Sequence, residues 1–246
     1  MPRPNASELV LSADGNIYHL RIKPEQLADT VILVGDPGRV SMVSSHFDRL
    51  EFQGQNREIL VHTGWIGKTG ISVISTGMGP DNIDIVVNEL DALVNIDLTT
   101  FEEKPQKTFL RLIRIGTSGS LQPDIPVDAF VAAEYAIGLD TLLRFYRPEG
   151  NSFDEEIAEE FIRQTQWKLD MGKPYVVRGS SELLSLMGEE VVRGITATAP
   201  GFYGPQGRKL RLPLAMPDMD ERLMRFRYRD RCITNFEMET SALYGL

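Results

Sequence analysis

Short apolar runs that end in glycine-rich turns mark the first half of the chain. Residues 31–34 are consecutively apolar and lead into Gly35-Asp36-Pro37-Gly38, which predicts a buried strand, a turn and a helix from about Val40. Further strands are predicted over residues 59–62 and 71–75, joined through glycines. From Pro80 onward, apolar residues recur at i, i+3, i+4, i+7 and i+10, which predicts an amphipathic helix.

The second half continues the alternation of strands and helices. Strands are predicted over 109–115, 128–133, 191–197 and 232–236, and helices over 218–229 and from about Met238. Ser152 and Glu155 form a capping-box pattern for another helix that reaches about Leu169. This order is typical of an α/β protein, and we expect residues 1–246 to form one domain. Because the chain stops inside the last predicted helix, we also expect that it lacks its C-terminal segment.

Composition narrows the class of protein. The net charge of −9 argues against a general nucleic-acid binder, because phosphate backbones attract an excess of Lys and Arg. Cys232 is the single cysteine, so an intrachain disulfide is excluded. There is no apolar run of the roughly 20 residues that span a bilayer, and the N-terminus lacks the apolar core of a signal peptide. We therefore expect no membrane partner and a cytoplasmic protein.

Two strand-to-turn junctions are candidate anion sites. The segment Gly35–Arg39 follows one predicted strand, and Arg114-Ile115-Gly116-Thr117-Ser118-Gly119 leaves another. Backbone N–H groups in glycine-rich turns can cradle an oxyanion, and Arg adds a planar, permanently charged fork. Neither junction is a Walker A loop or G-x-G-x-x-G. A solvated surface charge is the alternative for Arg39, whereas Arg114 lies within an otherwise apolar strand and needs an anion or a partner.

The segment Gly201–Arg208, G-F-Y-G-P-Q-G-R, carries a carboxamide and a guanidinium two residues apart. Gln206 can meet an adjacent donor and acceptor at once, and Arg208 can hold an oxygen that gains negative charge. Phe202 can cover the face of a heterocyclic ring. The pattern suits the edge of uracil; an ordinary Gly/Pro-rich surface turn is the alternative.

Carboxylates flank Met238 at the junction of the last strand and helix. A carboxylate there can accept hydrogen bonds from the vicinal hydroxyls of a ribose, or it can simply complement the helix dipole. The three histidines, His19, His46 and His62, have no metal-ligand spacing, so no metal site is predicted. A G-x-S-x-G elbow is also absent from the sequence, which argues against Ser-His-Asp hydrolase chemistry.

Together, four segments resemble the uridine phosphorylase branch of the nucleoside phosphorylase family. They are G-D-P-G-R, R-I-G-T-S-G, F-Y-G-P-Q-G-R and F-E-M-E-T, and they occur in the family's order. Lesser matches are Y-H-L around His19, N-R-E around Arg57 and S-T-G-M-G-P before the helix at Pro80. The resemblance covers about Asn16 to Leu246. It implies a three-layer αβα sandwich with a mixed, partly barrel-like central sheet.

The resemblance also implies a role for each matching residue. Inorganic phosphate would be bound by Gly35, Arg39, Arg57, Arg114 and Thr117. Ribose would be bound by His19, Met238 and Glu239, and the base by Phe202, Gln206 and Arg208, of which Gln206 and Arg208 would also be catalytic. His19 and Arg57 would reach the site of a neighbouring subunit, which implies a homodimer. Dimers of this family commonly assemble into hexamers, and the sequence does not decide between the two states.

The implied activity is reversible phosphorolysis of uridine to uracil and ribose 1-phosphate, with phosphate as co-substrate and no cofactor. The sequence leaves open the preference among uridine, deoxyuridine and thymidine, and an alkali cation near Glu58. A purine nucleoside phosphorylase, a phosphate-independent nucleosidase and a non-catalytic nucleoside-binding homologue remain as alternatives.

Overall fold

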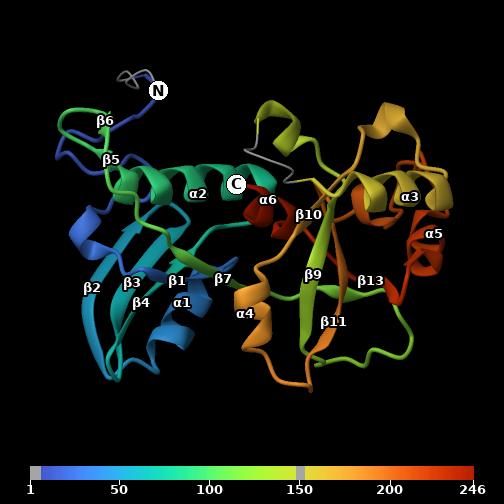
Figure 1. Cartoon of the computed structure of the whole chain (residues 1–246), viewed down its shortest axis with the longest axis horizontal. Coiled ribbons are helices and arrows are strands. Elements are labelled where there is room, and N and C mark those ends of the chain that lie inside the picture. Colours follow the sequence, from blue (N-terminus) through green and yellow to red (C-terminus); the bar gives the residue numbers. More distant parts are fainter. Residues whose placement is uncertain (1–6, 148–152) are drawn as a thin grey trace. The chain divides into compact units, whose positions relative to one another are not determined.

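The contacts within the computed structural model divide the chain into two compact units. The structure describes residues 7–147 and 153–246. Unit 1 contains residues up to Met78 together with Asn82–Gly116, and unit 2 contains Gly79–Asp81 and Thr117–Leu246 (Figure 1). Each unit combines a mixed sheet with helices, so the predicted α/β class is confirmed. The assignment of residues 1–246 to one domain stays a prediction.

A five-stranded sheet forms the frame of unit 1, in the order β2-β3-β4-β1-β7. Strand β1 (Thr30–Val34) pairs in parallel with β4 (Thr69–Ser75) and β7 (Arg111–Ile115). Strands β2 (Arg49–Asn56), β3 (Ile59–Ile66) and β4 form an antiparallel meander. Because β1, β4 and β7 run in the same direction, the loops that follow them leave from one edge of the sheet.

Two helices accompany this sheet. Helix α1 (Pro37–Ser44) begins three residues earlier than predicted, because Asp36 caps it through Gly38 N and Pro37 occupies the first helical position. Helix α2 (Pro80–Asn95) has the predicted apolar face, and its first two residues cluster with unit 2. That face is buried at Ile83, Val86, Val87, Leu90 and Leu93. The short pieces of unit 1 are η1 (Pro24–Gln26), β5 (Ile96–Asp97) and β6 (Glu102–Glu103).

The main sheet of unit 2 has the order β10-β9-β11-β13-β12. Its central strands β9 (Val131–Gly138), β11 (Val192–Thr198) and β13 (Arg231–Glu237) are parallel. Strands β10 (Tyr175–Arg178), β12 (Arg227–Tyr228) and β8 (Gly119–Ser120) add antiparallel pairs. The carboxyl ends of the central strands therefore meet at one edge, which is where ligand sites of α/β sheets form.

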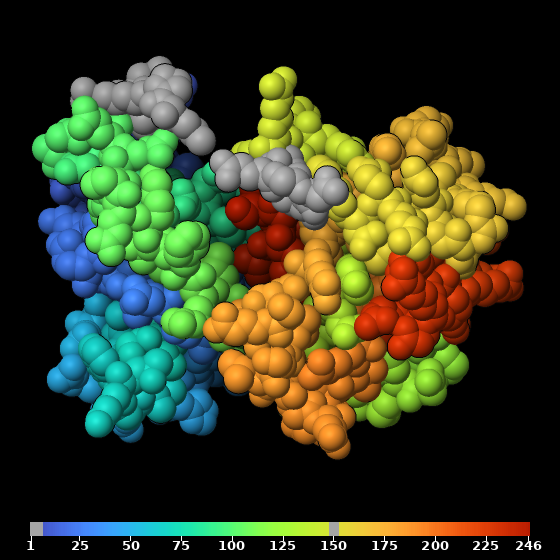
Figure 2. All heavy atoms as spheres, in the orientation of Figure 1, coloured from blue at the N-terminus to red at the C-terminus, as the bar shows by residue number. Residues whose placement is uncertain are grey.

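Helices cover both faces of this sheet, which gives three layers (Figure 1). Helices α3 (Glu155–Thr165) and α5 (Met219–Arg225) pack on one face and lie side by side in Figure 2, where they are yellow and red-orange. On the other face, α6 (Thr240–Gly245) packs against β9 and β10. Successive strand residues point to opposite faces of the sheet. Ile137 and Val176 belong to the hydrophobic cluster on the side of α3 and α5, and Ala136 and Tyr175 belong to the hydrophobic cluster on the side of α6. The predicted αβα layering is confirmed.

Several boundaries differ from the sequence predictions. The strands of the predicted single sheet are divided among a five-stranded, a six-stranded and a two-stranded sheet, and within the described residues none of these closes into a barrel. The predicted cap Ser152 lies outside the described residues; Asp154 caps α3, which ends at Thr165 because Gln166 adopts a left-handed conformation, well before Leu169. The strands predicted from 109 and 128 begin at Arg111 and Val131. The remaining short elements are η2 (Leu142–Phe145), η3 (Leu169–Met171) and α4 (Ser181–Ser185).

None of the described helices combines the length and the apolar character needed to cross a bilayer.

Candidate functional site

The predicted base-binding residues lie on a tight turn that follows β11. The turn contains η4 (Gly204–Gln206), and Gly207 closes it in a left-handed conformation with φ of 73°. The backbone N–H of Arg208 returns to the Tyr203 carbonyl at 2.9 Å. Glycine adopts this backbone conformation at little cost, so the turn brings the side chains on both sides of Gly207 together.

Gln206 and Arg208 contact one another directly. Arg208 Nη1 donates to Gln206 Oε1 at 2.5 Å and to the Phe202 carbonyl at 2.7 Å. The Gln206 side chain is buried, with 6% of its surface exposed. The guanidinium carbon lies 3.9 Å from the centre of the Phe202 ring, so this ring, predicted to cover a base, covers the guanidinium in the structure.

This contact fixes the direction of the Gln206 amide. Because Arg208 donates to Oε1, the amide NH₂ group must occupy the other end of the carboxamide. Oε1 has a second lone pair that can still accept a donor beside it. The pair therefore offers a donor, an acceptor and a positive charge within one short turn.

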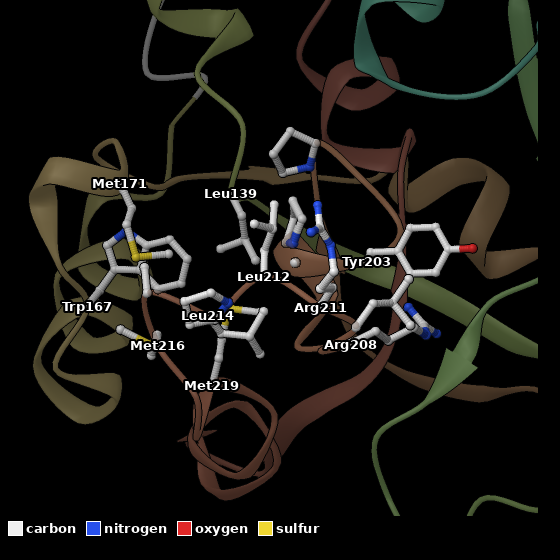
Figure 3. A pocket seen from close by; sticks show the side chains of 16 residues that line it. Leu139, Trp167, Met171, Tyr203, Arg208, Arg211, Leu212, Leu214, Met216 and Met219 are labelled. Atoms are coloured by element: carbon white, nitrogen blue, oxygen red, sulfur yellow. The ribbon is translucent and has the colours of Figure 1, made fainter.

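An apolar cavity of about 660 Å³ lies on the other side of the same turn, within unit 2 (Figure 3). Its apolar wall comprises Leu139, Trp167, Met171, Leu210, Leu212, Leu214, Met216 and Met219. Tyr203 and Arg208 line it too, whereas Phe202 and Gln206 do not. In Figure 3 the guanidinium of Arg208 points away from the apolar side chains. Arg208 thus contributes its aliphatic stem to the cavity and its charged end to the Gln206 side.

The predicted ribose residues lie where β13 ends and α6 begins. Glu239 is almost fully buried, and its Oε1 accepts the backbone N–H of Gly79 at 2.8 Å. Met238 is half-buried beside it. The preceding Glu237 is also buried, but it accepts hydrogen bonds from Thr198 Oγ1 and from the backbone of α6. The two carboxylates thus serve different partners, as expected from their positions on either side of Met238.

In unit 1, Gly35 and Arg114 come together at the edge where β1 and β7 end. Arg114 stands opposite Leu33 in the parallel pairing of these strands. A Cβ atom built on Gly35 would lie 4.0 Å from Arg114 Nη2 and 3.5 Å from the Gly77 carbonyl oxygen. Arg39 is half-buried in the first turn of α1. The structure therefore brings a guanidinium and a narrow backbone turn together at one strand edge, and their role as an anion site stays a prediction.

His19 and Arg57 share one surface of unit 1. The guanidinium carbon of Arg57 lies 5.9 Å from the centre of the Tyr18 ring, and this ring meets the His19 ring edge-on at 4.9 Å. Arg57 itself lies in the turn between β2 and β3 with φ of 54°. Asn56 Nδ2 donates to the His19 carbonyl oxygen at 2.9 Å. Two residues predicted to serve a neighbouring subunit are thereby joined through Tyr18.

A carboxylate that the sequence analysis missed holds His19 in place. Glu89, on α2, accepts the His19 Nδ1 proton at 2.5 Å and the backbone N–H of Leu20 at 2.8 Å. The backbone N–H of His19 lies 3.1 Å from both Glu89 oxygens. The sequence contains no local signal for this contact, because 70 residues separate the partners.

The remaining predicted positions are exposed. Thr117, in unit 2, follows Arg114 along the chain on the way to β8. Glu58 is exposed next to Arg57. Within residues 7–147 and 153–246 there is no group of three or more His, Cys, Asp or Glu side chains that could hold a metal ion. The assignment of a cation to Glu58 stays a prediction.

A family model described as the phosphorylase superfamily matches residues 29–246. The chain therefore belongs to this superfamily, and the resemblance found in the sequence is confirmed. The prediction of an enzyme of the pentosyltransferase class is confirmed with it.

Individual relatives agree with the family. The chain is 31% identical to a uridine phosphorylase of Thermococcus kodakarensis over 243 residues, which is 98% of this chain and 75% of that one. It is 35% identical to a DeoD-type purine nucleoside phosphorylase of a Thermoanaerobacter species, over 47% of this chain and 44% of that one. A Trypanosoma brucei nucleoside phosphorylase, whose crystal structure is described as showing uridine phosphorylase activity, matches with a TM-score of 0.84 and 33% identity, over 96% of this chain and 84% of that one. The predicted fold is thus confirmed, and the relatives include enzymes for both classes of base.

Proposed function

We propose that the chain catalyses the reversible phosphorolysis of uridine to uracil and ribose 1-phosphate. The observation that carries this proposal is the Arg208–Gln206 contact. A buried carboxamide with one fixed direction can read the adjacent carbonyl and N–H of uracil, and the guanidinium beside it can hold the second carbonyl. The similarity to uridine phosphorylases over nearly the whole chain supports the same substrate.

The proposed reaction needs no nucleophilic side chain. A phosphate oxygen attacks C1′ of the ribose, the bond from C1′ to N1 of uracil breaks, and uracil leaves with the electron pair and then takes up a proton. Positive charge grows on the sugar and is offset by the phosphate, while negative charge grows on uracil and is met by Arg208 and Gln206. Catalysis then depends on positioning and on charges arranged in advance.

Phosphate is held in this proposal by Gly35, Arg39 and Arg114, with Thr117 and the neighbouring subunit's Arg57 completing its shell. The approach of Arg114 to Gly35 supports the first part of this assignment. Glu239 takes the ribose hydroxyls, and burial favours this role because water competes less for a buried carboxylate.

The enzyme works as a homodimer in this proposal, since His19 and Arg57 act in the partner's site. Their connection through Tyr18 supports this assignment, because one surface presents both side chains. No cofactor is required, because phosphate supplies the attacking atom.

A nucleoside panel tests the proposal. Uridine, 2′-deoxyuridine, thymidine, inosine and adenosine are each incubated with the protein, with and without inorganic phosphate, and base release is measured by chromatography. We expect phosphate-dependent release of uracil from uridine. Faster cleavage of inosine or adenosine would instead support a purine nucleoside phosphorylase, which the match to a purine-specific relative keeps as the second candidate.

Two further outcomes would replace the proposal. Equal rates with and without phosphate would indicate a nucleosidase that uses water. Calorimetric binding of uridine without any cleavage would indicate a non-catalytic nucleoside-binding homologue.

A further inference from the structure

A buried carboxylate that the proposed reaction does not use lies two residues before the ribose-binding candidate. Glu237 is 6% exposed, and its carboxylate accepts hydrogen bonds from backbone N–H groups and from a hydroxyl group. Its Oε2 accepts the backbone N–H groups of Glu239 and Thr240, both at 2.8 Å. Its Oε1 accepts the Thr198 hydroxyl at 2.5 Å. Glu237 therefore ties the start of α6 to the end of β11.

From these contacts we infer that Glu237 is a positioning residue, which sets the direction of the Glu239 carboxylate and thereby the enzyme's preference for a ribose that carries its 2′-hydroxyl. This inference rests on the proposed function. Glu239 precedes α6 and is not in helical conformation, with φ of −139° and ψ of −26°. The N–H of such a residue has no acceptor within the helix, and Glu237 Oε2 accepts it instead.

The far end of the Glu239 side chain is held from a different segment. Gly79 N donates to Glu239 Oε1 at 2.8 Å. The residue is thus held at its own N–H and at one carboxylate oxygen, and its carbonyl oxygen accepts the backbone N–H of Leu243 at 3.1 Å. If the hydrogen bond from the Glu239 N–H to Glu237 is lost, the backbone of Glu239 can rotate. The Glu239 carboxylate then cannot both keep its contact with Gly79 N and point at two ribose hydroxyls.

Glu237 is itself held by a buried polar chain. Thr198 Oγ1, which donates to Glu237, accepts the backbone N–H of Ser241 at 2.9 Å. Ser241 Oγ donates to Asp140 Oδ2 at 3.1 Å, and Tyr175 donates to the same carboxylate at 2.8 Å. Burial, and then the Asp140 charge, raise the pKa of Tyr175, so its hydroxyl keeps its proton and remains a donor. The residues of this buried hydrogen-bonded network can be substituted one at a time at increasing distance from Glu239.

The test compares kcat/KM for uridine with kcat/KM for 2′-deoxyuridine in four variants. Glu237→Met removes both acceptor oxygens, and we expect the ratio of the two values to fall about tenfold, because hydrogen bonds to a charged group are among the stronger ones and the Glu239 contact to ribose is only partly lost. Glu237→Gln retains one oxygen that can accept both N–H groups, so its ratio should stay within about threefold of the wild type.

Thr198→Val is the second route to the same effect, since it removes the Thr198 hydroxyl that donates to Glu237 and leaves the shape of the Thr198 side chain unchanged. Its ratio should fall even if Glu237→Met does not fold. Tyr175→Phe is the matched control: it cuts the buried chain at a residue that does not touch Glu237 and should leave the ratio unchanged. Equal loss of activity on both nucleosides in the Glu237 and Thr198 variants, or an equal change of ratio in Tyr175→Phe, would overturn the inference.

Crystal structures of the variants separate this inference from the proposed function. In Glu237→Met or Thr198→Val we expect the separation of Glu239 Oε1 from Gly79 N to exceed hydrogen-bond distance, and in Tyr175→Phe we expect it to remain. Retention of the contact in every variant would refute the positioning role, whatever nucleoside the enzyme cleaves. Inactivity of the wild type on both nucleosides, by contrast, would refute the proposed function.

Discussion

Replacing Arg208 by methionine separates its charge from its packing. The guanidinium donates to Gln206 Oε1 and to the Phe202 carbonyl oxygen, while the aliphatic stem lines the apolar cavity. Methionine retains an unbranched apolar stem and removes all donors. Arg211→Met is the matched control, because Arg211 lines the same cavity and lies outside the proposed base site.

The expected loss is large because the substituted group meets charge that develops during the reaction. Removing one such donor typically lowers kcat by about 10²–10³. In addition, Gln206 loses the hydrogen bond that fixes the direction of its amide, so the Michaelis constant for uridine should rise as well. Arg211→Met should change kcat by less than about twofold, since surface substitutions away from such contacts have small effects.

Steady-state phosphorolysis of uridine at saturating phosphate, followed by chromatography of uracil, measures both parameters. Thermal unfolding of the two variants checks that they are folded. A fall in kcat of less than about tenfold in Arg208→Met would refute the charge-stabilising role. An equal fall in Arg211→Met would show that the cavity wall, and not the guanidinium contact, controls the rate.

Other predictions concern His19, the core and a buried tyrosine. Glu89→Gln should lower kcat/KM for uridine about tenfold, because an amide cannot accept all the donors of the His19 segment. A lost hydrogen bond to a charged group costs roughly 1.5 kcal/mol or more. Steady-state kinetics, together with a check of the oligomeric state, measures this effect. Phe161→Ala, which removes a fully buried ring, should lower the free energy of unfolding by about 3–5 kcal/mol in urea titrations. Burial raises the pKa of Tyr244 to about 12, so the unfolded chain loses this proton first; stability should fall as pH rises from 10 to 12, and less steeply in Tyr244→Phe. A fall of the same slope in the Phe variant would contradict that assignment.

The elements that the sequence predicted best have a pattern set by burial. The apolar run of β1 and the one-sided face of α2 reflect a covered strand and an amphipathic helix, so their periodicity is visible in the chain. Strand β2 was missed because it is an edge strand whose exposed residues are mostly polar. Strand β10 is also an edge strand, and with four residues it is too short to show a period.

Among the candidate site residues, the short-range relations were visible in the sequence. Gln206 and Arg208 meet because a single turn separates them, and Glu237 and Glu239 diverge because they lie on either side of one residue. The contact of Glu89 with His19 and that of Gly79 with Glu239 depend on pairings 70 and 160 residues apart. Such pairings follow from the packing of distant segments, which no local pattern encodes.

The most direct test of the central claim is the stoichiometry of the reaction with uridine. Phosphorus NMR follows ribose 1-phosphate while chromatography follows uracil in the same sample, with inorganic phosphate as the only added phosphorus compound. We expect equal amounts of both products and no uracil when phosphate is omitted. Release of uracil without ribose 1-phosphate, or at an undiminished rate without phosphate, would contradict the claim that phosphate attacks the sugar in this site.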